Sequence, residues 1–329
     1  MNVKKSILKS EQINNYILSQ IKSGVLTYNS IVPSIKQVSK ELGVANETVV
    51  KAYKKLKEQG ILYSVHGKGF FVAKVDIKEQ HRIFILFDTF AAYKETLYNA
   101  ILHQFGECAS LDIYFHHYNH KLFETLIKES AGKYTEYIIL SHLDQDITPV
   151  LNLLPSNKVF ILDGFVANYP TRGIYQDFEN DTYNALVSTG KSVLRYRNFY
   201  FIYKKRKYTK VLAQIKSGFI KFCKEAKIEN IVLEGDIIPE PQEGDAFVII
   251  DDDLLVELAL SAEKKGLRFG KDIGIISYND TPLKKISAGG ISVITTDFTA
   301  MGHKIADIIL NNRNECVKNK TYFIDRGSF

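Results

Sequence analysis

Short apolar runs alternate with helical stretches over most of this chain, from residue 82 to residue 278. Two of the helical stretches read ETLYNAILHQFGECAS and YTKVLAQIKSGFIKFCKEA. Eight runs are apolar almost throughout, and they read RIFILF, LDIYFHH, YTEYIILS, NKVFILD, NFYFIYK, ENIVLEG, DAFVIID and DIGIISY. Strands without polar alternation are buried on both faces, which is typical of parallel sheets covered by helices. Eight such strands over about 250 residues predict an α/β fold with two lobes, each built on a parallel sheet.

Charge is divided unevenly along the chain. Residues 1–75 contain twelve Lys and four Glu, a balance of +8, whereas the whole chain of 329 residues carries +6, which leaves −2 for the remainder. A small basic segment joined to a larger, nearly neutral one is typical of a nucleic-acid-binding domain attached to a domain that binds something else. A solvated, Lys-rich surface is the alternative that charge alone leaves open. The polar stretch KVDIKEQHR separates the two parts, so we expect domains at residues 1–76 and 77–329.

Three helices are predicted in the basic segment. Apolar residues recur at helical spacing from residue 10 to residue 21. Ser34 is a favourable N-cap for a second helix, which ends at Gly43. A third helix begins near Asn46, and its predicted buried residues are Val49, Ala52, Tyr53 and Leu56. Two helices joined by a short turn containing Gly form a helix-turn-helix, whose second helix enters the DNA major groove.

Polar residues on the outer side of the third helix suit contacts with bases. They are Asn46, Glu47, Thr48 and Lys51. An Asn side chain can pair with adenine, and the methyl group of Thr can contact thymine. Downstream, the β-prone runs ILYSV and GFFVAK are joined by HGKG, which predicts a hairpin with His66 and Lys68 at its tip. A basic hairpin beside a recognition helix is a wing, suited to the minor groove or to phosphates.

The stretch PSIKQVSKELGVANETVVKAYKKLKEQGILYSVHGKGFFV resembles the winged-helix domain of GntR-type bacterial transcription regulators, with four separated pieces of the family pattern in the right order. The residues that the resemblance assigns to DNA are Ser34 and Lys36 for phosphates, Asn46, Thr48 and Lys51 for the major groove, and Gly67, Lys68 and Gly69 for the wing. Glu47 and His66 lie among them and complete the candidate set. Lys36 and Asn46 stand where the family usually has Arg, and Ala45 stands where it has Ser, so the operator sequence does not follow from the resemblance. A winged helix used for protein contacts is the alternative.

In the larger part of the chain, polar residues directly follow the predicted strands. Ligands of open parallel sheets bind beyond the carboxyl ends of the strands. The residues at these ends are Asp88 and Thr89, Ser141 and His142, Asp163, Asp251 to Asp253, and Asn279 with Asp280. Carboxylates and amides can each pair with two adjacent hydroxyls, so this set predicts a polyhydroxylated ligand. Aromatic side chains available to stack on a sugar ring are Phe90, Tyr93, Tyr169 and Tyr175.

The stretch from Asp245 to Leu310 resembles the second lobe of the LacI-type, periplasmic-binding-protein-like effector domain, and the match is weaker from residue 82 to residue 244. The resemblance implies that Asp163 binds a sugar hydroxyl and that Asp251 and Asp252 occupy the family's Asn-Asp pair. Asn279 and Thr296 are further implied ligand contacts, although the family usually has Asp and Gln there. Ile215 replaces an Arg of the family, so the ligand cannot be copied from a relative, and Tyr203 or Lys204 is expected to fill that space.

A GntR-type head on a LacI-type body resembles the AraR-like regulators of sugar use. The resemblance implies a homodimeric transcription regulator, a repressor in our expectation, that binds operator DNA and changes its DNA affinity when a monosaccharide binds the cleft of the second domain. The run Lys204 to Lys207 leaves open an anionic ligand such as a sugar phosphate.

Catalysis is the other alternative, because the carboxylates Asp251 to Asp253 after a strand could hold Mg²⁺. No phosphate-binding loop, catalytic triad or dinucleotide-binding motif accompanies them, so we predict no enzyme, no cofactor and no metal. His116 and His120 have metal-like spacing only if they are helical. Three widely spaced Cys and the absence of an 18-residue apolar run or a signal peptide predict a protein of the cytoplasm that does not enter the membrane.

Overall fold

The computed structural model describes residues 2–75, 81–140, 142–204 and 210–329. The chain divides into two compact units, residues 1–79 and 80–329. Residues 76–80 of the predicted linker lie outside the described residues. In the described part of the chain, no helix is long and apolar enough to cross a membrane.

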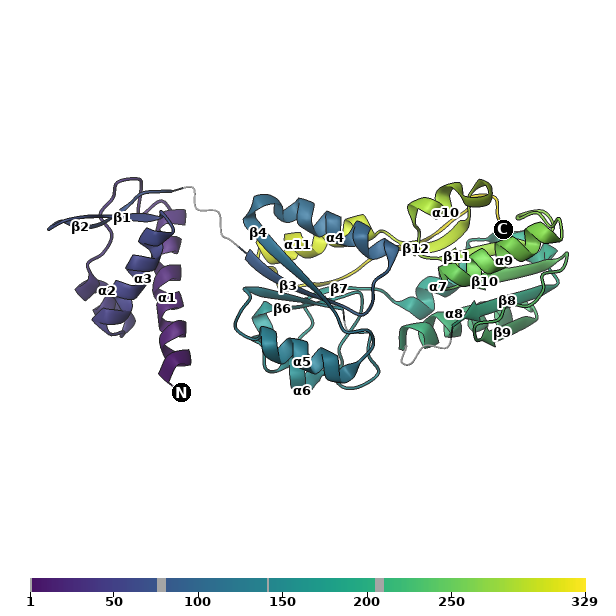
Figure 1. Ribbon diagram of the computed structural model, residues 1–329, viewed down its shortest axis with the longest axis horizontal. Helices are drawn as coiled ribbons and strands as arrows, with labels where there is room; N and C mark the ends of the chain where they lie inside the picture. Colours follow the sequence, from purple (N-terminus) through teal and green to yellow (C-terminus); the bar gives the residue numbers. More distant parts are fainter. Residues whose placement is uncertain (1, 76–80, 141, 205–209) are drawn as a thin grey trace. The chain divides into compact units, whose positions relative to one another are not determined.

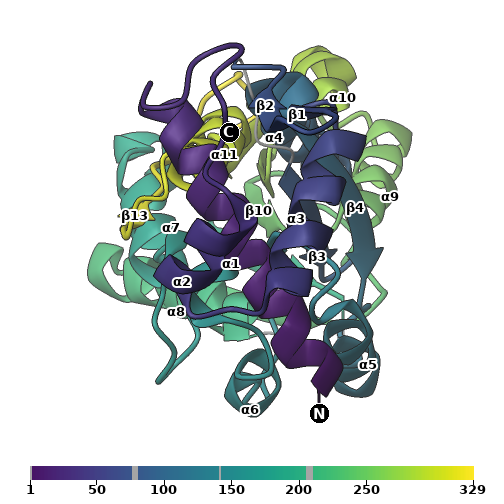
Figure 2. The same cartoon turned by 90° about the vertical axis from the view of Figure 1, so that its left-hand side faces the viewer.

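The N-terminal unit is a winged helix-turn-helix, as the sequence predicts. Its helices are α1 (Asn2–Lys22), α2 (Ile35–Leu42) and α3 (Asn46–Glu58). Strands β1 (Leu62–Val65) and β2 (Gly69–Val72) pair as an antiparallel hairpin. Figure 2 shows α1 and α3 side by side, with α2 packed against them. The first helix is longer than the predicted segment from residue 10 to residue 21.

Local contacts explain why α2 and α3 form where they do. Ser34 caps α2 in a capping box with Gln37, and Gly43 ends the helix in the left-handed conformation at φ 63°. The buried side of α3 contains Val49, Ala52, Tyr53 and Leu56, all four as predicted. The hydroxyl of Tyr53 donates to the Pro33 carbonyl at 2.8 Å and so ties α3 to the start of α2.

The first lobe of the second unit is a six-stranded parallel sheet between two layers of helices (Figure 1). Its strands, in spatial order, are β13 (Cys316–Lys318), β7 (Gly173–Tyr175), β6 (Val159–Leu162), β5 (Glu136–Ile139), β3 (His81–Phe87) and β4 (Ala109–Phe115). Helices α4 (Ala92–Phe105) and α11 (Phe298–Leu310) cover one face, and α5 (His120–Ser130) and α6 (Thr148–Leu151) cover the other.

The second lobe repeats this plan with one antiparallel edge strand, β14. Its strands, in spatial order, are β14 (Thr321–Ile324), β12 (Ser292–Thr296), β11 (Gly274–Tyr278), β10 (Asp245–Ile249), β8 (Asn198–Tyr203) and β9 (Asn230–Glu234). Its helices are α7 (Phe178–Val187), α8 (Lys210–Ala226), α9 (Asp252–Lys264) and α10 (Pro282–Ile286). Short 3-10 turns occur at 106–108, 156–158, 190–195 and 287–289.

All eight strands predicted from apolar runs are present. Side chains on opposite faces of a strand pack into different hydrophobic clusters. On β8, Phe199 and Phe201 pack with α7 and α8, whereas Ile202 packs with Leu254 and Leu258 of α9. Both faces of the sheet are therefore buried, as a parallel sheet requires. The two-lobed α/β prediction is confirmed.

The chain passes between the lobes three times. It leaves the first lobe between β7 and α7, returns between β12 and α11, and leaves again between β13 and β14. Each lobe is therefore assembled from segments that are far apart in sequence. Residues 176–177, 297 and 319–320 form these crossovers.

Close packing between α7 and α8 gives a test of the second lobe. A Cβ added at Gly218 of α8 would lie 2.2 Å from the Glu179 carbonyl oxygen of α7. We expect Gly218→Ala to reduce the free energy of unfolding by about 1–3 kcal/mol, because backbone rather than a flexible side chain must move. Chemical denaturation measures the change. Gln214→Ala, at an exposed position of α8, is the control and should leave stability within about 0.5 kcal/mol of wild type.

Candidate functional sites

The carboxyl ends of strands from both lobes meet at a cleft with a volume of about 420 Å³. Seven of the ten predicted ligand residues line it, and they are Asp88, Phe90, His142, Asp163, Asp251, Asp252 and Asn279. Ser141 lies outside the described residues. The strand-end principle accounts for six of these seven residues, all except Phe90, and they come from segments that only the sheets bring together.

Three polar residues of the cleft have a left-handed backbone. The φ angles are 20° for His142, 62° for Asp163 and 61° for Asn279, and each residue follows a strand. Non-glycine residues seldom adopt this conformation, because it brings Cβ close to the backbone, and such residues concentrate at functional sites. The strand ends are thus held in conformations that direct polar side chains to one place.

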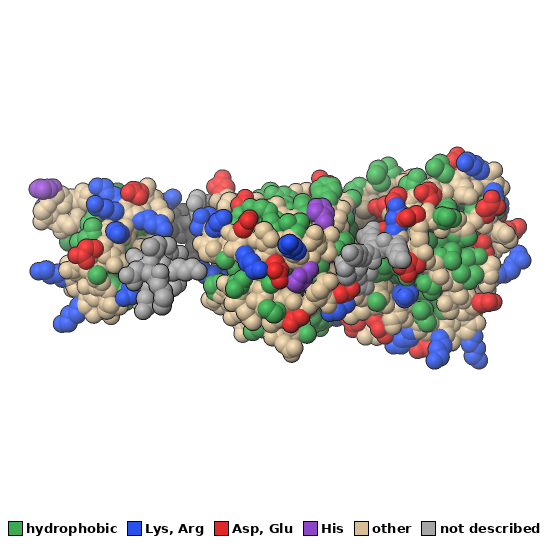
Figure 3. Space-filling view, turned by 60° about the horizontal axis from the view of Figure 1, so that its bottom comes forward, with side chains coloured by type: hydrophobic (Ala, Val, Ile, Leu, Met, Phe, Trp, Pro, Cys, Tyr) green, Lys and Arg blue, Asp and Glu red, His purple; other side chains and the backbone are tan. Residues whose placement is uncertain are grey.

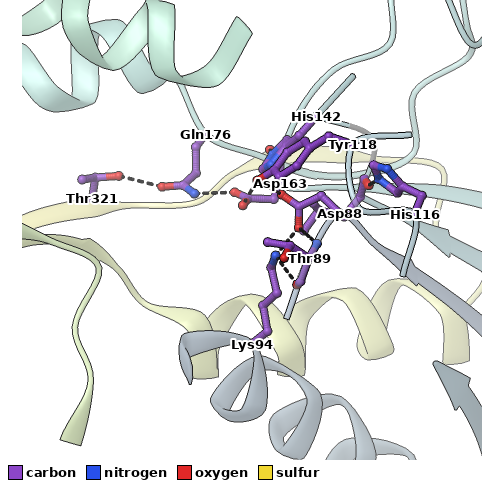
Figure 4. Close-up of polar contacts among 10 residues, drawn as sticks. Asp88, Thr89, Lys94, His116, Tyr118, His142, Asp163, Gln176 and Thr321 are labelled. Carbon is purple, nitrogen blue, oxygen red and sulfur yellow. Dashed lines mark hydrogen bonds and ion pairs between the residues drawn. The ribbon is translucent and has the colours of Figure 1, made fainter. Parts of the chain in front are cut away.

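Asp88 is buried and already fully hydrogen-bonded. Its carboxylate accepts from the Thr89 N–H at 2.7 Å, the Tyr118 hydroxyl at 3.0 Å and His142 Nδ1 at 3.1 Å, and it forms an ion pair with Lys94 (Figure 4). A carboxylate has about four acceptor positions, so no position remains for a ligand. Burial opposes ionisation, but the Lys94 charge and the His142 hydrogen bond outweigh it and hold the pKa of Asp88 well below its usual range. Asp88 therefore organises the floor of the cleft.

His142 faces an acceptor on each ring nitrogen. Nδ1 is bonded to Asp88, and Nε2 lies 2.8 Å from the main-chain carbonyl of Asp163. Both contacts are hydrogen bonds only when both nitrogens carry a proton, as in imidazolium. Burial lowers the pKa of His142, but the hydrogen bond and charge of Asp88 overcome this, and the net shift is upward. Lys94, Asp88 and His142 thus alternate in charge across the floor.

Asp163 keeps capacity for a ligand. One of its carboxylate oxygens accepts from the side-chain amide of Gln176, while the other lies 3.7 Å from His142 Nε2 and accepts no hydrogen bond from the described residues (Figure 4). Burial is the largest influence on this group, and it raises the pKa of Asp163. A ligand hydroxyl donating to the second oxygen would stabilise the ionised form.

In the second lobe, Lys284 is committed to the protein. Its ammonium donates to the carbonyl oxygens of Tyr278 and Asn279, each at 2.8 Å, and pairs with Asp252 at 2.7 Å. These contacts use all three of its N–H groups. Burial lowers the pKa of Lys284, against the opposing effect of Asp252. The second carboxylate oxygen of Asp252 and the side-chain amide of Asn279 form no hydrogen bond with other residues in the described ranges.

The acidic end of β10 also has partners. Asp251 accepts from the Lys204 main-chain N–H at 2.9 Å, and Asp253 pairs with the Lys204 ammonium. Among the described residues, no group of three or more His, Cys, Asp or Glu could hold a metal ion. His116 follows β4 and is buried, whereas His120 begins α5, so the two do not share a helix.

Aromatic and aliphatic side chains complete the walls of the cleft. They are Phe90, Tyr93, Tyr118, Phe178, Val211, Leu212, Ile215 and Tyr278. Phe90 is 80% exposed and so available for stacking, whereas Tyr93 already stacks on Phe298 with ring centroids 4.5 Å apart. Tyr169 and Tyr175, which sequence reasoning assigned to stacking, are absent from this lining and pack elsewhere in the first lobe.

Tyr203 and Thr296 do not line the cleft. The Tyr203 ring packs in the α7–α8 core, and its hydroxyl donates to Glu234 at 3.1 Å. Thr296 ends β12, where its hydroxyl donates to the Lys320 carbonyl at 2.9 Å within the crossover region. Sequence reasoning missed Tyr118, Gln176 and Lys284. The first two lie outside predicted strand ends, and a Lys in a helix carries no signal of burial.

The predicted DNA-binding residues form an exposed surface on the N-terminal unit. Lys36, Asn46, Glu47 and Lys51 are exposed, Thr48 is half-buried, and the hairpin tip of His66, Gly67, Lys68 and Gly69 is exposed. The Ser34 hydroxyl accepts the cap hydrogen bond from the Gln37 N–H at 3.3 Å and retains its own proton to donate. On the face shown in Figure 3, the basic side chains of this unit, all of them Lys, outnumber the acidic ones.

Comparison with known families gives the class of each unit. Residues 9–72 match the family model of bacterial regulatory proteins of the gntR family, and residues 193–328 match the periplasmic-binding-protein-like domain. The chain therefore combines a GntR-type helix-turn-helix with a periplasmic-binding-protein-like domain. Both resemblances noted in the sequence are confirmed, and the likeness to AraR-like regulators stays a prediction.

Individual relatives are transcription regulators. The HTH-type transcriptional repressor NagR of Bacillus subtilis is 32% identical over 68 residues, which cover 21% of this chain and 28% of NagR. A periplasmic binding protein/LacI transcriptional regulator from Alkaliphilus metalliredigens, complexed with D-xylulofuranose, is 13% identical with a TM-score of 0.61, covering 75% of this chain and 98% of its own. A dimeric Lac repressor with a C-terminal deletion is 18% identical with a TM-score of 0.60 and the same coverage. These matches agree with the prediction that the chain is not an enzyme.

The raised pKa of His142 predicts a pH dependence of stability. A group whose pKa is higher in the folded state than in the unfolded state stabilises the fold. This stabilisation is complete at pH values below the unfolded-state pKa, which is about 6.5 for His, and it is lost as the pH rises through the folded-state pKa. We expect His142→Gln to remove this loss of stability, which begins above about pH 6.5. Thermal unfolding at several pH values measures it. His103→Gln, at an exposed position of α4, should keep the wild-type profile.

Proposed function

We propose that this chain is a transcription regulator that binds operator DNA through its winged helix-turn-helix and changes its DNA affinity when a monosaccharide binds the interlobe cleft. The observation that carries the proposal is the pairing of a GntR-type DNA-binding unit with a cleft lined by strand-end carboxylates and an amide. Such a regulator acts on chromosomal DNA and hence in the cytoplasm.

The distribution of charge favours an uncharged sugar over a sugar phosphate. Lys94, Lys204 and Lys284 are each paired with a carboxylate, and His142 donates from both nitrogens. The groups left to receive a ligand include the amide of Asn279, the hydroxyls of Thr89 and Thr281 and, as charged groups, the carboxylate acceptors of Asp163 and Asp252. Hydroxyl groups satisfy such acceptors, whereas a phosphate would need donors. Lys205 to Lys207, the remainder of the basic run, lie outside the described residues.

Repression and dimerisation are parts of the same proposal. NagR, the relative of the N-terminal unit, is a repressor, and the Lac repressor structure similar to the second unit is dimeric. Helices α9 and α10 expose four large apolar side chains, Val256, Leu260, Leu283 and Ile286. Exposed apolar side chains on neighbouring elements suit a contact with a second copy of the chain.

Closure of the lobes provides the switch. A sugar that contacts Asp163 of the first lobe and Asp252 of the second binds best when the lobes approach, so it favours the closed state. Operator affinity then changes by the ligand's differential affinity for the two states, typically about 5- to 150-fold.

Two lysines test the DNA-binding surface. Lys51 on α3 and Lys68 in the hairpin are exposed, and each phosphate contact contributes about one unit to the slope of log affinity against log salt. We expect Lys51→Ala and Lys68→Ala each to weaken DNA binding and to reduce this slope by about 0.9. Fluorescence anisotropy titrations at several salt concentrations measure both quantities. Lys121→Ala on α5 is the control, and unchanged slopes in both test variants would remove these residues from the interface.

A thermal-shift series tests the ligand class and the cleft. Neutral monosaccharides, their phosphates and nucleotides are added to the full chain, and a true ligand at about 100 times its dissociation constant adds about 2.7 kcal/mol of stability. We expect a neutral sugar to give the shift. Calorimetry should then show at least about tenfold weaker binding to Asp252→Asn, because a charged acceptor is lost.

The control for this series is Asp112→Asn, an exposed carboxylate on β4 that does not line the cleft. It should bind the sugar as wild type does. A shift with phosphates alone would overturn the neutral-sugar class, and normal binding by Asp252→Asn would overturn the cleft assignment.

A further inference from the structure

Gln176 connects the ligand-binding floor with the crossovers between the lobes. We propose that Gln176 is a positioning residue that couples occupancy of Asp163 to lobe closure, through its hydrogen bond to Thr321. The inference rests on the proposed function and concerns how binding of a sugar in the cleft is coupled to movement of the lobes.

The contacts of Gln176 define a bridge. Gln176 is buried in the first crossover, and its amide Nε2 donates to a carboxylate oxygen of Asp163. Its Oε1 accepts from the hydroxyl of Thr321 at 3.3 Å, at the start of β14 beyond the third crossover (Figure 4). One side chain therefore joins a cleft residue of the first lobe to a strand of the second.

The chemistry of the bridge sets its direction. Asp163 offers only acceptors when ionised, so the amide nitrogen must face it and the amide oxygen must face Thr321. Thr321 is then the donor. A glutamine supplies a donor and an acceptor on one planar group, so a displacement of Asp163 is transmitted to Thr321 without a change of partner. An apolar side chain at position 176 would break both contacts at once.

Thr321 belongs to a network that holds the other crossovers. It pairs with Thr296 across β12 and β14, and the Thr296 hydroxyl accepts from the Asn319 amide at 2.6 Å. The same amide lies 3.1 Å from the carbonyl of Asp297, the second crossover. The main-chain N–H of Asn319 donates to the Tyr175 carbonyl, next to Gln176, at 2.8 Å. All three crossovers are thus hydrogen-bonded around the Gln176–Thr321 contact.

Asp163 is the cleft residue through which a ligand would act on Gln176. It is buried, one of its oxygens accepts a hydrogen bond from Gln176, and its second oxygen is open to a ligand donor. A sugar hydroxyl on that oxygen stabilises the carboxylate and fixes its orientation. The Gln176 amide must follow that orientation to keep its bond. Closure of the lobes would move β14 together with the second lobe. The hydrogen bond between Gln176 and Thr321 then makes closure easier or harder according to the orientation of Gln176.

The experiment separates binding from coupling. Thr321→Val removes the hydrogen bond between Thr321 and Gln176 but leaves Gln176 bonded to Asp163. Gln176→Leu removes both hydrogen bonds. The probe is whichever of L-arabinose, D-xylose, D-ribose, D-glucose and D-galactose stabilises wild type. Calorimetry gives the sugar affinity, and operator affinity is titrated with and without that sugar.

We expect Thr321→Val to bind sugar within about threefold of wild type while the ratio of operator affinities with and without sugar falls at least about fivefold toward unity. Gln176→Leu should also weaken sugar binding by at least about tenfold, because Asp163 loses a partner. Thr125→Val, whose hydroxyl bonds only within α5 among the described residues, is the matched control. A wild-type ratio in Thr321→Val overturns the proposal.

A second measurement does not depend on the sugar. The main-chain N–H of Asn319 should exchange its hydrogen at least about threefold faster in ligand-free Thr321→Val than in wild type, because the hydrogen bonds around the crossovers are weakened. An unchanged exchange rate counts against the bridge even if no sugar in the panel binds. If no sugar stabilises wild type but this exchange accelerates, the proposed ligand class fails and the bridge stands.

Discussion

Because helices cover both faces of each parallel sheet, the polar groups that bind a ligand lie at the carboxyl ends of the strands. Here the edges formed by these strand ends in the two lobes face the same cleft. The left-handed backbones of Asp163 and Asn279 occur at these edges, where the chain must turn sharply out of a buried strand. The position of the site thus follows from how the sheets are covered, and its chemistry follows from which side chains stand at the turns.

Burial of charge determines what the cleft can recognise. Each buried cation near it is neutralised by a carboxylate or by carbonyl oxygens, because an unpaired buried charge is costly. Asp88 is saturated by the same rule and serves as a structural anchor. The remaining capacity includes carboxylate acceptors from both lobes, Asp163 and Asp252, so a ligand rich in hydroxyl groups gains hydrogen bonds from both when they close.

Much of this arrangement could be predicted from the sequence, because buried parallel strands are long apolar runs. The four strands that were not predicted from apolar runs, β7, β12, β13 and β14, are short or lie near the crossovers, and their pairing depends on segments distant in sequence. Six of the seven predicted ligand residues that line the cleft were found from strand ends, and the seventh, Phe90, was found as an aromatic side chain. Thr296 and Tyr203 were expected in the cleft from family positions, but Thr296 satisfies its hydroxyl within the crossovers and Tyr203 packs in the core. Lys284 and Gln176 could not be found, since burial of a lone polar side chain is a property of the packed fold.

In the proposed mechanism, one chain converts the binding of a sugar in the cleft into a change of DNA affinity. The most direct test is to select operator fragments from genomic DNA with the full chain and to titrate one fragment by anisotropy, with and without a sugar that calorimetry shows to bind. We predict an operator affinity that differs about 5- to 150-fold between the two conditions. Equal affinities in the presence of saturating sugar would show that the two units do not communicate and would contradict the proposed mechanism.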